Sequence, residues 1–434
     1  MNISNLKKTY YYLKRNGIKR TISAVEEQVF HPYFKDYKYE VPDDRLLEKQ
    51  RRESEGKKLC FSILVPAYET PEEYLRQLIQ SLLNQSYPVW QLIIADAGKT
   101  ALVKNICEAY QDSRICYVKL KENSGISQNT NAAIPYIKGE YTGLLDHDDY
   151  LTPDALYEME KAISEGKAIG REYDFLYSDE DKCEETGRIF YQPHFKMDFN
   201  LDLLLSNNYI CHFLVMKSSV IRELGLRPEF DGAQDYDLVL RMVQRLWNEG
   251  RVLEEEIRHI PKVLYHWRCH EASTASNPAS KSYAYEAGKR ALEDFCSKRD
   301  WQVKVETLPH VGFYKVLYEN GIFAQRTDVA ALGGKEVKNG RIVNSIYNNQ
   351  GAALYEGMKA SHSGYVHRAV LTQNAEQLDI DKWKINPVIL NKYETFFEAQ
   401  ASKEYTSEEE KRRILCEFLK KEGYRLYWDP DWRV

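Results

Sequence analysis

The sequence has no closely spaced pair of cysteines. Its eight cysteines are scattered along 434 residues, none stands in a C-x-x-C pair, and none has the Cys/His spacing of a zinc site. This distribution argues against a disulfide-stapled secreted scaffold and a zinc-binding module, and scattered single thiols are typical of a reducing compartment. The cysteines are Cys60, Cys107, Cys116, Cys183, Cys211, Cys269, Cys296 and Cys416.

Long apolar runs are also missing. The longest stretch without a charged residue, residues 77–95, contains four glutamines, an asparagine, two serines and a proline, which makes it a poor membrane span. Near the start of the chain, Lys7 and Lys8 lead into tyrosines rather than into the apolar core of a signal peptide. We therefore expect a cytoplasmic protein and leave open a peripheral position at the inner face of the plasma membrane.

Neither sign of charge is in large excess. The chain has 60 basic and 65 acidic side chains, a net charge of −5, which argues against nucleic-acid binding through bulk charge. Basic residues nevertheless gather in residues 1–20, which hold six lysines and arginines and no acidic residue. Apolar residues recur at helical spacing through residues 1–30, with an interruption at Gly17. This pattern predicts basic amphipathic helices that either contact an anionic membrane surface or dock on the protein with their basic face in water.

The length corresponds to about two or three domains. We assign residues 1–57 to the N-terminal helices and a linker, residues 58–300 to the main domain and residues 301–434 to an accessory region. In the main domain, short apolar runs alternate with helical patterns, and Thr70-Pro71 and Thr152-Pro153 are typical helix starts. This alternation predicts an α/β domain with a mostly parallel sheet. The predicted strands are residues 60–65, 91–95, 114–120 and 141–145.

Three carboxylates follow the last of these strands within four residues. Asp146, Asp148 and Asp149 repel one another unless a cation lies between them. Hard oxygen ligands suit Mg²⁺ or Mn²⁺, which bind one or two carboxylates together with substrate phosphates. A solvated acidic turn is the alternative. The position favours a metal-diphosphate site, because ligands of such sheets bind at the carboxyl ends of the strands.

Seven segments in this order resemble the family 2 glycosyltransferases of the GT-A fold, which build bacterial surface polysaccharides such as rhamnans. The resemblance covers about residues 59–300 and implies a Rossmann-like, mostly parallel sheet flanked by helices, here with N-terminal helices and a smaller C-terminal α+β extension. The segments are ILVPAYE (63–69), IIADAG (93–98), NSGISQN (123–129), LLDHDD (144–149), YSDEDK (177–182), GAQDYDL (232–238) and YHWR (265–268).

The resemblance implies roles for individual residues on the donor side. Asp146 is expected to face the ribose or the metal, Asp148 to face the metal and the diphosphate, and Asp149 to bind or orient. Asp96 is expected near the base or ribose, although it could also cap the turn after its strand. The chain has Asp96-Ala97-Gly98-Lys99 where the family usually has Asp-Asp-Gly-Ser. The full set expected to bind the nucleotide sugar is Pro66, Ala67, Tyr68, Glu69, Asp96, Asn123, Gly125, Asn129, Asp146, Trp267, Arg268 and His270, with Ser273 as an alternative phosphate contact to His270.

Asp235 is the candidate catalytic base. It precedes an apolar helical pattern, and an inverting transfer needs a carboxylate that takes the proton from the acceptor hydroxyl. Asp235 could also act as a helix cap. The family usually has Glu-Asp at this position, whereas this chain has Gln234-Asp235.

The accessory region contains pieces that resemble the acceptor-side half of a second transferase domain. No second D-x-D turn accompanies them, so we interpret the region as a degenerate half-module without catalysis of its own. Its aromatic and acidic tail, residues 427–432, is expected either to dock on the domain or to bind a saccharide.

The predicted function is metal-dependent, inverting transfer of a sugar from a UDP- or dTDP-linked donor to a glycan or lipid-linked oligosaccharide. A non-catalytic, sugar-binding partner in a glycan assembly complex is the alternative, motivated by Gln234 and the half-module. A nucleotidyltransferase is disfavoured, because residues 66–69 are not the glycine-rich, basic loop that it would need after the first strand.

Overall fold

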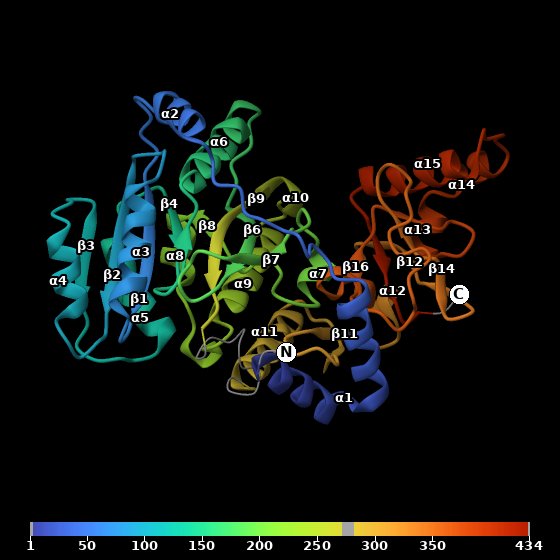
Figure 1. Ribbon diagram of the computed structural model, residues 1–434. Coiled ribbons are helices and arrows are strands. Elements are labelled where there is room, and N and C mark those ends of the chain that lie inside the picture. The colour runs from blue at the N-terminus through green and yellow to red at the C-terminus, as the bar shows by residue number, and fades with distance from the viewer. Residues whose placement is uncertain (1–2, 271–281, 433–434) are drawn as a thin grey trace. The chain divides into compact units, whose positions relative to one another are not determined.

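The computed structural model describes residues 3–270 and 282–432, which form two compact units (Figure 1). The central unit comprises residues 34–199 and 209–291, and the terminal unit comprises residues 1–33, 200–208 and 292–434. The N-terminal helix therefore groups with the C-terminal part of the chain. None of the helices in the described ranges combines the length and the apolar character needed to cross a membrane.

A nine-stranded sheet forms the middle of the central unit. Its order is β3-β2-β1-β4-β8-β6-β9-β5, with β7 paired to β6. The pairs among β3, β2, β1 and β4 are parallel, as is the β6–β9 pair, whereas β8 is antiparallel to both of its neighbours. The strands are β1 (Phe61–Ala67), β2 (Trp90–Asp96), β3 (Ile115–Lys119), β4 (Tyr141–Leu144), β5 (Tyr150–Leu151), β6 (Phe175–Cys183), β7 (Phe190–His194), β8 (Leu214–Lys217) and β9 (Ile257–Arg268).

The four strands predicted in the first half of the domain are confirmed as β1 to β4. Strands β1 and β2 are buried almost throughout, because helices cover both faces of the parallel part of the sheet. The helices and helical turns are α2 (Asp44–Glu53), α3 (Glu72–Leu83), α4 (Leu102–Ala109), α5 (Ile126–Ala133), η1 (Ile134–Tyr136), α6 (Ala155–Ala168), α8 (Ser218–Leu224), η2 (Pro228–Phe230), α9 (Gln234–Asn248), α10 (Leu253–Glu256) and α11 (Ser282–Lys298). The expected α/β fold class is confirmed.

The predicted cap of α3 is wrong in detail. Pro71 rather than Thr70 is the N-cap residue, and no side chain caps the helix. The Thr70 hydroxyl lies 2.9 Å from Nδ1 of His147 instead. The hydroxyl is therefore used to hold the acidic turn after β4 rather than the start of α3.

The terminal unit has a four-stranded sheet of its own, in the order β16-β19-β12-β18. Trp428 of β19 is fully buried, and Asp429 and Asp431 both accept hydrogen bonds from Lys315. The aromatic tail therefore docks on its own unit. The elements are α1 (Ile3–Phe30), α7 (Leu201–Leu204), β10 (Val303–Thr307), β11 (Tyr314–Tyr318), α12 (Ile322–Gln325), β12 (Val329–Gly333), β13 (Glu336–Lys338), β14 (Arg341–Asn344), β15 (Ile346–Tyr347), η3 (Tyr365–Val370), β16 (Gln373–Asn374), β17 (Gln377–Leu378), β18 (Lys384–Ile385), α13 (Pro387–Lys392), α14 (Glu394–Ala401), α15 (Glu408–Lys421) and β19 (Arg425–Trp428).

Candidate active site

The acidic turn, residues 146–149, links the central strand β4 to the short strand β5. Strand β4 pairs with β1, and β5 pairs with the end of β9, where Tyr150 lies opposite His266. The backbone N–H of Asp149 donates to the carbonyl of Asp146 and closes the turn. The turn is therefore held on both sides by strands, which fixes the directions of its three carboxylates.

Asp149 points into the protein. Its side chain is fully buried and accepts hydrogen bonds from the Tyr265 hydroxyl at 2.5 Å and from the backbone N–H of Arg268 at 2.7 Å. Burial, followed by the nearby carboxylates of Asp148 and Asp146, raises the pKa of Asp149 well above its usual value. A carboxylate in such surroundings is stabilised in its charged form by a cation.

Asp148 and Asp146 point in different directions. Asp148 lies 2.9 Å from Nε2 of His270, and although burial raises the pKa of Asp148, this hydrogen bond and the charge of His147 lower it overall. The side chain of Asp146 is 46% exposed, and its Oδ2 lies 4.0 Å from Nε2 of His212. Partial burial of this side chain and the charge of Asp148 together raise the pKa of Asp146, despite the opposing charge of His212.

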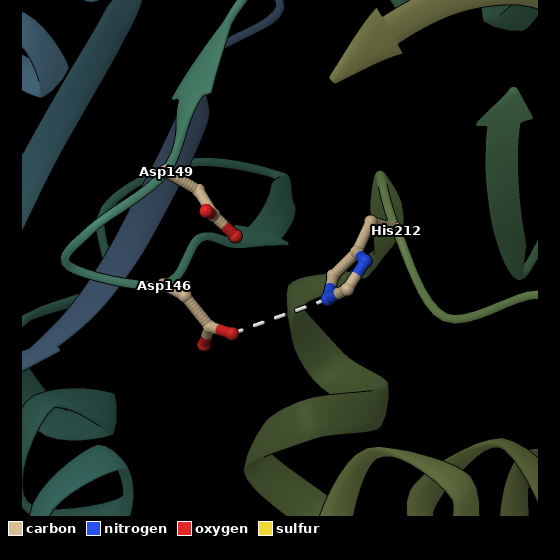
Figure 2. A group of neighbouring side chains, drawn as sticks. All are labelled: Asp146, Asp149 and His212. Carbon is tan, nitrogen blue, oxygen red and sulfur yellow. Dashed lines mark ion pairs between the residues drawn. The ribbon is translucent and has the colours of Figure 1, made fainter. Parts of the chain in front are cut away.

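His212 completes a group of three potential metal ligands with Asp146 and Asp149. One ligand atom from each of the three lies within 4.8 Å of the other two. Figure 2 shows the two carboxylates, which come from the turn after β4, facing the imidazole, which comes from the loop before β8. Two oxygen ligands and one nitrogen ligand fit Mn²⁺ well and Mg²⁺ less well, because Mg²⁺ prefers oxygen. Within the described residues, Asp148 is not part of this group.

Glu180 and Tyr265 fix the orientation of the His212 ring. Its Nδ1 lies 3.0 Å from Oε2 of the buried Glu180, and its ring stacks on Tyr265 at a centroid distance of 4.5 Å. Burial lowers the pKa of His212, but the charges of Glu180 and Asp146 raise it overall. Lys196 donates to the same carboxylate at 3.2 Å. A metal-binding histidine usually contacts a carboxylate through the ring nitrogen that does not bind the metal. This contact fixes the orientation of the ring and leaves the other nitrogen to face the metal.

Asp235 stands in the first turn of α9. The thiol of Cys211, the neighbour of His212, donates to Oδ2 of Asp235 at 3.3 Å. The negative charge of Asp235 also raises the pKa of Asp146, so these two carboxylates share one electrostatic environment. The side chain of Gln234 accepts a hydrogen bond from the backbone N–H of Gly232 and secures the turn that leads into α9. The structure thus places the candidate base beside the candidate metal group.

The resemblance implies that Arg268 contacts the nucleotide sugar, whereas in the structure its side chain is surrounded by protein groups. Its fully buried guanidinium donates to the carbonyls of Asp148 and Glu185 and to Oε1 of Gln77, each at 2.6 Å. The side chain therefore fastens the acidic turn to the loop around residue 185. Trp267 lies closer to the ligand group, with its ring centroid 5.7 Å from that of His212. Ser273 lies outside the described residues.

The expected base and ribose pocket lies at the ends of the neighbouring strands β1 and β2. Ala67 and Asp96 are paired in register, and Tyr68 is exposed just beyond Pro66 and Ala67. The Glu69 carboxylate accepts a hydrogen bond from the backbone N–H of Lys99, which ties the two strand ends together.

Asp96 itself is fully buried. Its carboxylate accepts hydrogen bonds from the backbone N–H of Gly98 at 2.7 Å and from the Tyr117 hydroxyl at 2.8 Å, and it lies 3.2 Å from the ammonium of Lys119. These contacts match the turn-capping alternative. Asp96 is thus fully enclosed by protein groups, whereas Tyr68 is exposed.

The loop before α5 is held together by hydrogen bonds of two asparagine side chains. Oδ1 of Asn123 accepts hydrogen bonds from the Gly125 backbone N–H and from Nδ2 of Asn129, and Oδ1 of Asn129 accepts one from the Ser124 N–H. Gly125 has a φ of 93°, and a Cβ there would lie 2.4 Å from the carboxylate of Asp231. The positive φ and this close approach together require glycine at the turn.

Two groups of the site were not among the residues selected from the sequence, His212 and Glu180. Glu180 is one of three neighbouring acidic residues in the segment 177–182, with nothing in the sequence to distinguish it, and His212 is a single histidine with no spacing signal. A buried acid in a strand and a histidine 32 residues later become neighbours only through the pairing of β6 with β8.

Comparisons with known proteins show the family of the chain. The profile of Glycosyl transferase family 2 matches residues 62–225. A putative colanic acid biosynthesis glycosyl transferase of Escherichia coli, WcaA, is 30% identical over 208 residues, which cover 46% of this chain and 72% of WcaA. The chain belongs to glycosyltransferase family 2.

Two further relatives are much longer than the matching segment. The uncharacterized protein y4gI of Sinorhizobium fredii is 40% identical over 260 residues, covering 58% of this chain and 27% of y4gI. The O-antigen biosynthesis protein RfbC of Myxococcus xanthus is 33% identical over 262 residues, covering 59% of this chain and 20% of RfbC. The chain thus matches about a quarter or less of each of these two relatives.

Among solved structures, the chain is similar to S. aureus TarS 1-349 in complex with UDP-GlcNAc. The sequence identity is 17% and the TM-score 0.42, with 56% of this chain and 66% of the TarS chain covered.

Proposed function

We propose that the chain transfers a sugar from a UDP- or dTDP-linked donor to a glycan or lipid-linked oligosaccharide during synthesis of a cell-surface polysaccharide. The observation that carries this proposal is the grouping of Asp146, Asp149 and His212 next to Asp235, at the strand ends of a family 2 glycosyltransferase. The names of the relatives WcaA and RfbC point to polysaccharide synthesis as the setting. None of the eight cysteines forms a disulfide, which fits a reaction on the cytoplasmic side of the membrane.

Asp235 has a separate role in the transfer from the residues that hold the donor. In an inverting transfer, the acceptor oxygen attacks the anomeric carbon as the bond from that carbon to the diphosphate oxygen breaks. The Asp235 carboxylate takes the proton of the acceptor hydroxyl, and the nucleoside diphosphate leaves with the electron pair of the broken bond. The charge of Asp235 acts on Asp146, and His212 follows Cys211, whose thiol contacts Asp235. His212 and Asp146 would therefore hold the diphosphate end of the donor close to the base.

Asp146, Asp149 and His212 would hold the divalent cation, Mn²⁺ or Mg²⁺. Bound there, it supplies Lewis-acid stabilisation of the negative charge that develops on the departing diphosphate. Glu180 keeps the His212 ring oriented, and Tyr265 and Arg268 keep Asp149 in place.

Calorimetric titration of UDP, dTDP and GDP tests the donor part of the proposal. We expect one of the three nucleotides to bind with a clear preference in the presence of Mn²⁺ and to lose affinity after EDTA. Asp146→Asn should bind that nucleotide equally weakly with and without Mn²⁺. Failure of all three nucleotides to bind would contradict the proposal and favour the non-catalytic partner.

A further inference from the structure

Helix α1 docks on the terminal unit through polar groups. The buried carboxylate of Glu27 accepts hydrogen bonds from the backbone N–H groups of Ser363 and Gly364, each at 2.8 Å. Before the kink that Gly17 makes in α1, Nδ2 of Asn16 donates to the carbonyl of Pro309 at 3.0 Å. The side of α1 that faces its own unit is therefore fastened by hydrogen bonds to backbone groups.

The opposite side of α1 carries an exposed apolar stripe, defined here as Ile18, Ile22, Val25, Val29 and Phe30. The first four are spaced by four, three and four residues, which places them on one face of a helix. Their side chains, together with that of Phe30, are between 41% and 72% exposed. An amphipathic helix of a globular protein normally turns such a stripe toward the core. In α1 the stripe faces solvent instead of the core. An exposed apolar stripe of this kind marks an interaction surface.

The charges around the stripe identify what it binds. Lys19 and Arg20 are exposed on the helical segment that carries the stripe, and Lys14 and Arg15 are exposed on the segment before the kink at Gly17. No acidic residue occurs among residues 9–25. The chain as a whole has a net charge of −5, so this basic segment differs from the rest of the protein. A symmetric dimer through the stripe would bring these cations against their own copies. An anionic lipid surface offers the opposite charge together with an apolar interior.

We propose that α1 is a membrane-docking helix that inserts the stripe into an anionic lipid surface while its polar side stays fastened to the terminal unit. The basic residues draw the helix to the headgroups, and the apolar side chains enter the boundary between headgroups and acyl chains. The inference is independent of the proposed sugar transfer, since it rests on the terminal unit alone. It would hold the enzyme at the surface where a lipid-linked acceptor is found.

Sedimentation of the full chain with lipid vesicles tests this proposal. We expect binding to vesicles of phosphatidylcholine with phosphatidylglycerol, at least tenfold weaker binding to phosphatidylcholine alone, and loss of binding at high salt. The triple variant Ile18→Ser, Ile22→Ser, Val25→Ser should bind the anionic vesicles at least tenfold more weakly. Because these side chains are exposed, its melting temperature should equal that of the wild type.

A matched control removes equally exposed apolar side chains elsewhere. Ile169, Ile189 and Val252 are between 55% and 68% exposed, and their triple change to Ser should leave vesicle binding unchanged. The proposal is overturned if the wild type does not sediment with anionic vesicles, or if the α1 variant sediments as the wild type does. A dimer in solution that the α1 variant dissolves would assign the stripe to a second copy of the chain and would also overturn it.

Discussion

His212 faces Asp146 with one ring nitrogen and Glu180 with the other: Nε2 lies 4.0 Å from Oδ2 of Asp146, and Nδ1 lies 3.0 Å from Oε2 of Glu180. The strands β4, β6 and β8 bring these three residues together from distant parts of the chain. A histidine held in this way presents a fixed nitrogen to the same space as the half-exposed carboxylate. The acidic turn is thus extended by a ligand from a separate loop.

The first prediction ranks two residues by their effect on metal binding. His212→Ala should lower the affinity for Mn²⁺ in the presence of UDP by at least tenfold, because it removes a ligand from the group of three. Asp148→Ala should change that affinity by less than threefold, because Asp148 is paired with His270. Equilibrium dialysis of Mn²⁺ measures both constants, and the reverse order would assign the metal to Asp148.

The second prediction concerns the catalytic base. Asp235→Asn keeps the shape of the side chain but removes its ability to accept a proton, so kcat should fall by about 10²- to 10⁴-fold. The KM for the donor should remain within about threefold of the wild-type value, since the diphosphate end is held by other residues. Steady-state kinetics with varied donor measures both parameters. A wild-type kcat in this variant would exclude Asp235 as the base.

Much of this arrangement follows from the sequence, and the reasons are physical. Buried parallel strands such as β1 and β2 have continuous apolar runs, and polar residues directly after them must lie at one edge of the sheet. For this reason Tyr68, Asp96 and Asp146 were predicted to lie at the strand ends that now form the candidate site.

Other features depend on contacts that no local pattern encodes. The carboxylates of Asp149 and Asp148 are directed by Tyr265, Arg268 and His270, which come from β9 and the residues just after it. The carboxylate of Asp146 faces His212 instead. His212 enters the site only through the pairing of β8 with β4 and β6. The amphipathic pattern of α1 predicted the helix but not its orientation, because the hydrogen bonds to Glu27 come from residues more than 330 positions away.

The third prediction distinguishes two roles of Arg268. Because its guanidinium makes three buried hydrogen bonds to protein oxygens, Arg268→Met should lower the free energy of unfolding by about 3 kcal/mol. Thermal and urea unfolding measure this loss. A variant with unchanged stability and strongly reduced nucleotide affinity would instead identify Arg268 as a direct phosphate ligand.

The fourth prediction concerns the stability of the terminal unit toward acid. Burial raises the pKa of Asp328, but the paired Arg326 outweighs burial and lowers it to about 2. A pKa below that of the unfolded chain stabilises the folded state above about pH 4, and this contribution of about 2 kcal/mol is lost as the pH falls toward 2. Urea unfolding between pH 6 and pH 2.5 should therefore show a shallower loss of stability for Asp328→Asn than for the wild type. Asp36→Asn, a change at an exposed position, should leave the wild-type slope intact.

Release of nucleoside diphosphate from a panel of UDP-, dTDP- and GDP-linked sugars, with a bacterial glycan acceptor fraction present, tests the proposed transfer most directly. We expect release from one donor with Mn²⁺ or Mg²⁺, loss of release on addition of EDTA, and recovery when excess Mn²⁺ is restored. Asp235→Asn should release nucleotide at least about a hundredfold more slowly under the same conditions while still binding the donor. Release that persists in EDTA, or no release from any donor despite nucleotide binding and an acceptor, would contradict metal-dependent sugar transfer by this chain.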